Sequence, residues 1–285
     1  MRFFFSIIAA LAAIYTSAQT DTTKMEIVRP VVSAYTLETG SSHITDTYLS
    51  PLKYTGLSAA IGYERCQAMK FCPEKWVMQL RLTAGMDYTD NPAKNVNIMG
   101  FGLSSTWGMI RKFRNVWQEG LHIYAGGSTS LNLGALYSTR NGNNPVSAKA
   151  SWTVNATAMA TFSLKIKSLP ITLRYQPTIP ICGIFFSPEY DQLYYEIYKG
   201  NTSRIVNFAQ PFSYFYMDNL LTADLRLGGT TLRLGYHGTI LSTEVHHIVC
   251  NMSSHNFLIG IANEWVTLSP RKKISDSAKV ISSIY

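Results

Sequence analysis

The stretch from Asn219 to Leu241 constrains the fold more than any other part of the sequence. It reads NLLTADLRLGGTTLRLGYHGTIL, and Gly228-Gly229 divides it into two segments in which apolar and polar residues alternate. Alternation with a period of two is typical of β-strands, and a two-residue glycine turn joins two strands in a hairpin. One face of this hairpin is wholly apolar, while the other carries Asp224, Arg226, Arg233 and His237. The stretch predicts a sheet with one charged side.

The same alternation recurs along the rest of the chain. Besides the two hairpin segments it covers Val31–Glu38, Thr55–Arg65, Trp76–Tyr88, Met99–Met109, Leu121–Leu133, Trp152–Ile166, Ile171–Ile181 and Phe257–Trp265. Several of these segments exceed the five or six residues of an ordinary soluble strand and suit the roughly 9–11 residues of a tilted membrane strand. The pattern therefore predicts about ten strands.

The connections between these segments alternate in length. Long polar connections are expected at Gly40–Lys53, Asp90–Asn95, Arg140–Ser147, Ser187–Gln210 and Ser242–Ser254, with shorter ones between them. Short turns at one end and long loops at the other are typical of outer-membrane barrels. The sequence thus predicts an all-β fold: an antiparallel up-and-down transmembrane β-barrel with short periplasmic turns and longer outer loops. A soluble secreted β-sandwich that binds a ligand is the alternative fold.

The N-terminus has the pattern of a secretory signal. Arg2 precedes an apolar run from Phe3 to Ile14, and small residues follow at Thr16-Ser17-Ala18. We therefore expect a signal peptide over 1–18, a periplasmic segment over 19–30, the barrel over 31–268 and a C-terminal tail over 269–285. Export to the cell outer membrane makes membrane lipid the expected partner.

Composition agrees with a chain that has one face in lipid. Only 15% of residues are charged, against about a quarter in soluble domains, and tyrosine is abundant. The net charge of +8 fits attraction to anionic lipid head groups, while export and the absence of a basic helix argue against nucleic acid as a partner.

The polar faces of the strands carry charges of both signs. Charges far from bulk water must be paired or solvated. We therefore expect the inward side chains to form a network of charges in the lumen and to leave it largely filled, without a wide pore. The residues of this expected network are Glu64, Arg81, Arg174, Asp224, Arg226, Arg233 and His237.

The long connection Ser187–Gln210 is the best candidate for ligand binding. It combines aromatic and acidic residues that suit a sugar or another small polar ligand, namely Tyr190, Asp191, Tyr194, Tyr195, Glu196 and Tyr198. The other interpretation, which the length of the loop favours, is that it folds inward and plugs the barrel.

A catalytic role is the rival hypothesis. Ser242, Glu244 and His246 supply the residue types of an acyl-transfer site, as in a rim-located protease or lipid hydrolase. Their spacing matches no known motif, and adjacent His246-His247 on an extended segment point to opposite sides, which disfavours a metal site. The sequence therefore predicts neither enzyme activity nor a cofactor.

The four cysteines leave three disulfide pairings open. Cys66 and Cys72 are close in sequence and could pair, and Cys182 and Cys250 are both expected near the outer rim and could pair if their loops meet. Free thiols are an equal alternative.

Several stretches also carry a family resemblance. They are DTYLSPLKYTG, EKWVMQLR, GGSTSLNLGALYSTRNGNNP, LPITLRYQPTIP, SPEYDQLYYEIYKGN and DNLLTADLRLGGTTLRLGY. In these the chain resembles an uncharacterised family of Bacteroidetes outer-membrane-type β-barrel proteins, a domain of unknown function. The resemblance implies the barrel fold and the outer membrane, and it implies no reaction. The expected function is a structural, surface-binding or narrow-passage barrel.

Overall fold

The computed structural model describes residues 27–114, 116–142, 144–190, 192–266 and 278–284. The predicted signal peptide over 1–18 lies outside the described residues, as do residues 19–26 of the predicted periplasmic segment. Strand β1 (Ile27–Val28) pairs in parallel with β13 (Lys279–Val280), and this pair belongs to a small unit separate from the rest of the chain. Within the described ranges, no helix has the length and apolar character that crossing a membrane requires.

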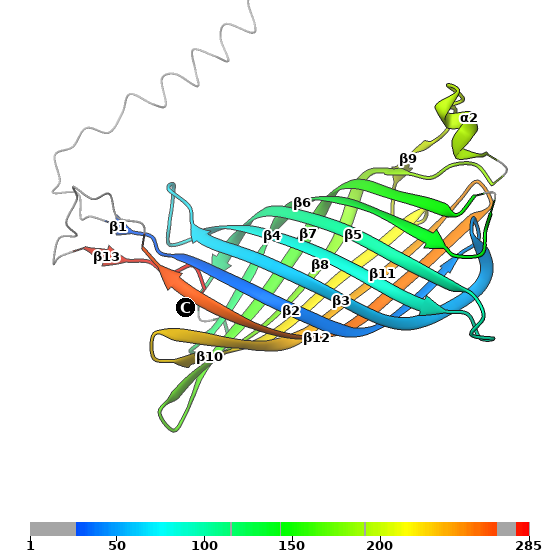
Figure 1. The fold of residues 1–285 in the computed structure, drawn as a ribbon. Helices are drawn as coiled ribbons and strands as arrows, with labels where there is room; N and C mark the ends of the chain where they lie inside the picture. The colour runs from blue at the N-terminus through cyan, green and yellow to red at the C-terminus, as the bar shows by residue number, and fades with distance from the viewer. Residues whose placement is uncertain (1–26, 115, 143, 191, 267–277, 285) are drawn as a thin grey trace, which may run out of the picture. The chain divides into compact units, whose positions relative to one another are not determined.

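Long antiparallel strands form a closed barrel (Figure 1). They are β2 (Val31–Asp46), β3 (Ser50–Ala68), β4 (Trp76–Asp90), β5 (Asn97–Phe113), β6 (Leu121–Ser138), β7 (Val146–Ile166), β8 (Leu169–Phe186), β10 (Tyr214–Leu227), β11 (Thr230–Val245) and β12 (Ile248–Trp265). Neighbours in the sheet follow the order β10-β11-β12-β2-β3-β4-β5-β6-β7-β8, and β8 pairs again with β10 to close the ring. Among the described residues these ten strands make one closed sheet, which confirms the predicted barrel and excludes the two-sheet sandwich.

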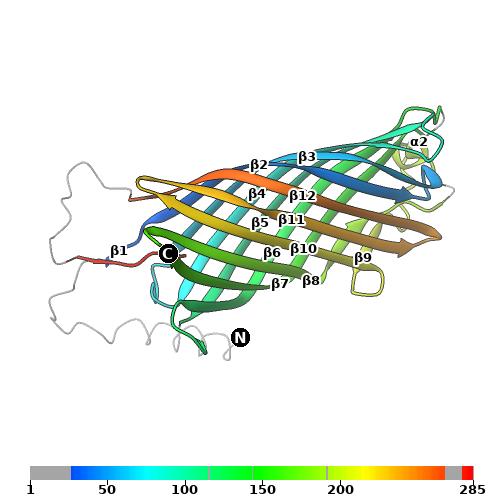
Figure 2. The same ribbon diagram turned by 90° about the horizontal axis from the view of Figure 1, so that it is seen from below.

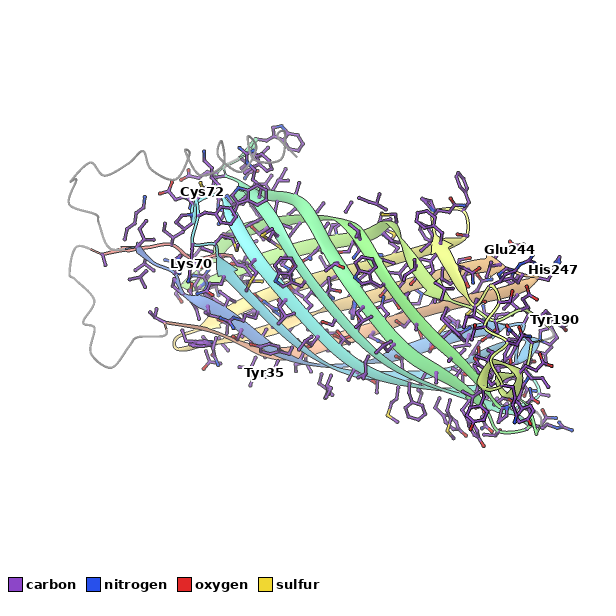
Figure 3. All side chains as sticks on the ribbon, turned by 90° about the horizontal axis from the view of Figure 1, so that it is seen from above. Tyr35, Lys70, Cys72, Tyr190, Glu244 and His247 are labelled. Atoms are coloured by element: carbon purple, nitrogen blue, oxygen red, sulfur yellow. The ribbon has the colours of Figure 1, made fainter. Side chains whose placement is uncertain are left out.

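The strands are longer than the alternation alone indicated. Two connections expected to be long, Gly40–Lys53 and Ser242–Ser254, are largely strand, and tight turns at residues 47–49 and 246–247 join them. Those two loop predictions were wrong because a strand that rises beyond the lipid layer needs no apolar face, so its polar residues resemble a loop in the sequence. We call the end with these turns the loop end, and the end with the Gly228-Gly229 turn the turn end. Figure 2 shows the strands running between them, and Figure 3 labels Glu244 and His247 at the loop end and Cys72 at the turn end.

Burial is inverted relative to a soluble protein. Leu57 and Ile61 are 71% and 63% exposed, whereas the guanidinium-bearing Arg174 and Arg233 are 2% and 1% exposed. The apolar side chains therefore stand on the outside of the barrel, as Tyr35 does in Figure 3, and the polar ones fill the inside. This arrangement is stable when the outer surface meets lipid.

The pairing between β8 and β10 is interrupted toward the loop end. Residues 183–186 of β8, at the loop end, pair with the short strand β9 (Val206–Ala209). Residues 171–178, nearer the turn end, pair with β10. The β8–β10 pairing ends at Thr178, and Pro180 follows, where proline lacks the N–H that a ladder requires. Between Pro180 and Cys182 the register of β8 against β7 shifts, and beyond the shift Phe185 is buried beside Tyr214, with their ring centroids 5.1 Å apart.

Candidate functional site in the barrel lumen

A layer of charged side chains crosses the lumen. On β3, Glu64 accepts hydrogen bonds from Arg174 of β8 (Nη1 to Oε2, 2.9 Å) and from Arg233 of β11. Arg233 also donates to Asp224 of β10 through Nε and Nη2, at 2.7 and 2.8 Å. Since β3 and β8 lie on opposite sides of the ring, the Glu64–Arg174 pair spans its width. We call these four residues the charge layer.

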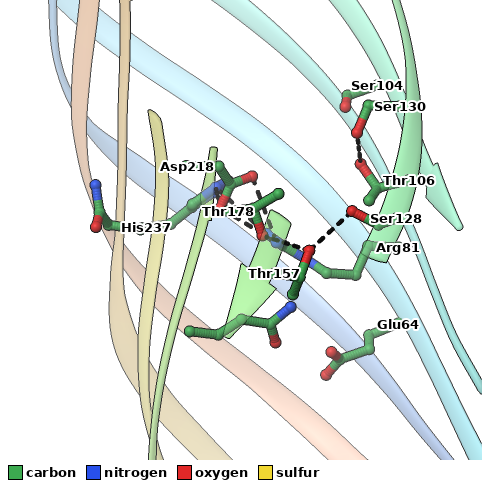
Figure 4. Close-up of polar contacts among 12 residues, drawn as sticks. Glu64, Arg81, Ser104, Thr106, Ser128, Ser130, Thr157, Thr178, Asp218 and His237 are labelled. Atoms are coloured by element: carbon green, nitrogen blue, oxygen red, sulfur yellow. Dashed lines mark hydrogen bonds and ion pairs between the residues drawn. The ribbon is translucent and has the colours of Figure 1, made fainter. Parts of the chain in front are cut away.

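A second cluster lies beside the charge layer (Figure 4). Arg81 of β4 donates to Asp218 of β10 at 3.1 Å, again between strands on opposite sides of the ring. His237 lies between Asp218, 3.5 Å from its Nε2, and Glu38, 2.6 Å from its Nδ1. Of the sequence-predicted lumen residues, six therefore lie in these two clusters, while Arg226 lies further along β10, near the turn end.

Sequence reasoning missed Glu38 and Asp218. Both lie where the apolar face of the strand has faded, Glu38 at the end of the expected first segment and Asp218 just before the hairpin. Continuing the period of two along β2, which pairs with the strand of Glu64, would have placed Glu38 inside the barrel. Continuing it along β10 from Asp224 would have placed Asp218 inside as well.

A cavity of about 260 Å³ lies in the lumen on the loop-end side of these clusters. Its polar wall includes Ser42, Ser58, Asp87 and Asn256, and Glu38, Asp218 and His237 also line it. Part of the wall on β4, β5 and β6 is made of the small residues Gly85, Gly100, Gly102 and Gly134. The opposite part is apolar and includes Phe185, Tyr214, Tyr216, Leu241 and Met252. The cavity therefore has a polar side and an apolar side.

The C-terminal residues pack into the turn end of the barrel. Ile281, Ser283 and Ile284 are all buried, and the Tyr124 hydroxyl donates to the Ser283 carbonyl at 3.2 Å. Ile284 belongs to an apolar cluster with Val32, Cys66, Val77, Ile110, Tyr124 and Met159. We call this cluster the apolar layer. The part of the predicted tail from 281 to 284 thus packs inside the barrel.

The connection after β8 contacts the β2–β3 turn and β7 at the loop-end rim. Tyr48, in the β2–β3 turn, donates to the Gln192 carbonyl at 3.0 Å, and its ring meets that of Tyr194 edge to face at 5.7 Å. The Tyr194 hydroxyl accepts from the Ala148 backbone at 2.6 Å. Below them Lys149 of β7 pairs with Asp46 of β2 at 2.8 Å. The connection therefore crosses the rim as a strap.

The predicted binding residues of this connection differ in exposure. Tyr194 is held as described, while Tyr190, Tyr195 and Tyr198 are exposed. Glu196 lies with Tyr194, Tyr195 and Tyr198 in the short helix α2 (Tyr194–Tyr198), and Asp191 lies outside the described residues.

The strap supports a prediction about pH. Burial raises the pKa of Tyr48 to about 12, and nearby Tyr194 and Asp46 add to the shift. Because the folded pKa lies above the ordinary value of 10, the neutral hydroxyl stabilises the strap below pH 10, and this contribution is lost as the pH rises from 10 through 12. Phenolate absorbance is titrated with pH in the wild type and in Tyr48→Phe. The difference between the two curves should correspond to one tyrosine with a midpoint near pH 12. A midpoint at 10 would contradict the buried contact.

Two residues of the rival rim-hydrolase hypothesis have separate partners. Ser242 donates to Asn251 at 2.7 Å, and His246 Nε2 lies 2.8 Å from Asn207 Oδ1. Across the described ranges, no three His, Cys, Asp or Glu side chains form a group that could hold a metal ion. All four cysteines are free in the structure, with Cys66 and Cys250 buried and Cys72 exposed.

The fold and lumen define a class of protein: a transmembrane-type β-barrel with a charged interior. The chain belongs to the family described as "Protein of unknown function (DUF3316)", which matches residues 4–272. No curated protein matches it.

Solved structures that resemble the barrel share little sequence with it. The transport unit of the autotransporter AIDA-I from Escherichia coli is 7% identical with a TM-score of 0.40, over 90% of this chain and 97% of that one. The translocator domain of the autotransporter NalP from Neisseria meningitidis is 11% identical with a TM-score of 0.39, over 92% and 96%. An outer-membrane channel from Pseudomonas putida F1 is 9% identical with a TM-score of 0.37, over 87% and 100%. Likeness at this level carries no argument about function.

Proposed function

We propose that this protein is an outer-membrane β-barrel that binds a small molecule in its lumen and provides no open passage through the membrane. The observation that carries the proposal is the charge layer, in which Glu64 and Arg174 meet from opposite sides of the ring.

The width of the barrel makes such a closure effective. Ten strands spaced about 4.8 Å apart and tilted by about 40° give a backbone radius of roughly 10 Å, which inward side chains from two sides can fill. The apolar layer lies nearer the turn end and adds a second closure that contains no charged side chain. A hydrated ion would have to break paired charges and then cross apolar side chains.

The cavity supports the binding part of the proposal. Its volume of about 260 Å³ approaches the roughly 300 Å³ at which small-molecule sites begin. It also combines a few polar groups with apolar walls, as such sites do. Membrane residence is supported by the exposed apolar side chains along the strands and by the signal-like N-terminus. No catalytic step is part of the proposal, since Ser242 and His246 are each bonded elsewhere.

Planar-bilayer recording tests the closed lumen. The purified barrel, whose folded state is verified by a mobility change between unboiled and boiled samples, is expected to give no sustained conductance steps. Liposomes that contain it should retain glucose as well as protein-free liposomes do. Stable conductance steps or glucose leakage from the folded protein would refute the closed lumen.

A further inference from the structure

The cavity contains a carboxyl group without a cationic partner. Asp87 accepts hydrogen bonds from Ser42 and Ser58, and in the described part of the chain it forms no ion pair. The other charged residues that line the cavity are paired: Glu38 with His237, Asp218 with Arg81, and Lys149 with Asp46. The cavity therefore has one carboxyl group that a ligand could pair with.

A neighbouring amide adds a second acceptor. Asn256, which is 4% exposed, also lines the cavity, and its Nδ2 donates to Ser58 Oγ at 3.3 Å. Its Oδ1 is buried and has no hydrogen-bond partner in the structure. A buried acceptor without a donor is unfavourable, so a ligand that donates a hydrogen bond here would remove that cost.

The chain leaves space beside this polar wall. A Cβ atom added to Gly100 would lie 3.0 Å from Asp87 Oδ2, whereas one added to Gly102 would have nothing within 4 Å. Facing this space, Phe185 and Tyr214 present aromatic rings, and Leu241 and Met252 extend the apolar wall. A ligand that fills the space must therefore be polar and cationic at one end and apolar at the other.

We propose that the lumenal cavity binds a small amphipathic amine, with its protonated nitrogen at Asp87 and Asn256 and its apolar part against Phe185 and Tyr214. This inference rests on the proposed function, because it states the chemistry of the molecule that the cavity takes. A protonated amine supplies the charge that Asp87 lacks and the donors that Asn256 lacks.

The test uses two probes of nearly equal shape, 2-phenylethylamine and 2-phenylethanol. Calorimetric titration of the full chain in detergent micelles at neutral pH is expected to show at least about tenfold tighter binding of the amine, the size of one charged hydrogen bond. This comparison needs no variant. Equal binding of the two probes, or no binding of the amine, would overturn the inference.

Two variants with matched controls locate the binding. Asp87→Asn should remove the preference for the amine, while Glu244→Gln, which removes an exposed carboxylate outside the cavity, should retain it. Gly102→Leu should fill the open space and abolish binding of both probes, while Gly142→Leu in an exposed loop should not.

The outcomes separate the two proposals. If Gly102→Leu abolishes binding but Asp87→Asn keeps the amine preference, the cavity binds ligands and the amine inference is wrong. If binding survives Gly102→Leu in the folded barrel, the probe binds elsewhere and the lumenal site of the proposed function is itself refuted.

Discussion

Replacing Glu64 by alanine should destabilise the folded barrel by about 3–5 kcal/mol, the cost of removing one partner of a buried ion pair. Glu64 accepts from Arg174 and Arg233, which are almost fully buried, and from Gln79 Nε2 at 2.6 Å. Arg233 would keep its ion pair with Asp224, but the ion pair of Arg174 with Glu64 would be lost. The effect is measured by incubating the protein in increasing urea and following, on gels of unboiled samples, the fraction that keeps the mobility of the folded barrel.

Two comparison variants make this result specific. Glu189→Ala breaks the exposed Glu189–Arg204 pair at 3.5 Å and should cost no more than about 1 kcal/mol. Glu64→Gln keeps the shape and part of the hydrogen bonding, so its loss should lie between the other two. Equal urea midpoints for Glu64→Ala and Glu189→Ala would show that the charge layer is not a buried network.

Deleting residues 281–285 should expose the apolar layer to water from the turn end. Burial of each of Ile281 and Ile284 contributes about 1.5–3 kcal/mol. Because Cys66 lies in the same cluster as Ile284 and is 1% exposed, its thiol should react with iodoacetamide about tenfold faster or more in the truncated chain.

The chain contains its own references for that measurement. Cys72 is exposed at the turn end and should react in both proteins, while Cys250 is buried toward the loop end and should stay protected in both. Mass spectrometry of the labelled peptides distinguishes the three. Ile284→Ala should give a smaller acceleration at Cys66, and Val280→Ala, at a 62% exposed position, should give none. Unchanged protection of Cys66 after the deletion would show that 281–285 do not close the lumen.

The strand pattern was readable from the sequence because it is local. The hairpin register pairs Leu227 with Thr230 across Gly228-Gly229, as the two-residue turn predicts. The same period of two located all ten barrel strands, and it identified Glu64, Arg81, Arg174 and Arg233 as inward residues. It failed near the loop end, where both faces of a strand are polar and the strand resembles a connection.

The sequence by itself determined the strands, their inward faces and therefore the fold, since side chains on a strand alternate regardless of what lies across from it. The tertiary structure alone decided which inward residues meet. Glu64 finds Arg174, Arg81 finds Asp218, and Ile284 finds Cys66 only after the ring closes with a particular stagger between strands. That stagger comes from the pairing of all ten strands together, so no local pattern specifies it. The meeting of Glu64 with Arg174 across the ring and the position of Asp87 in the cavity follow from that stagger.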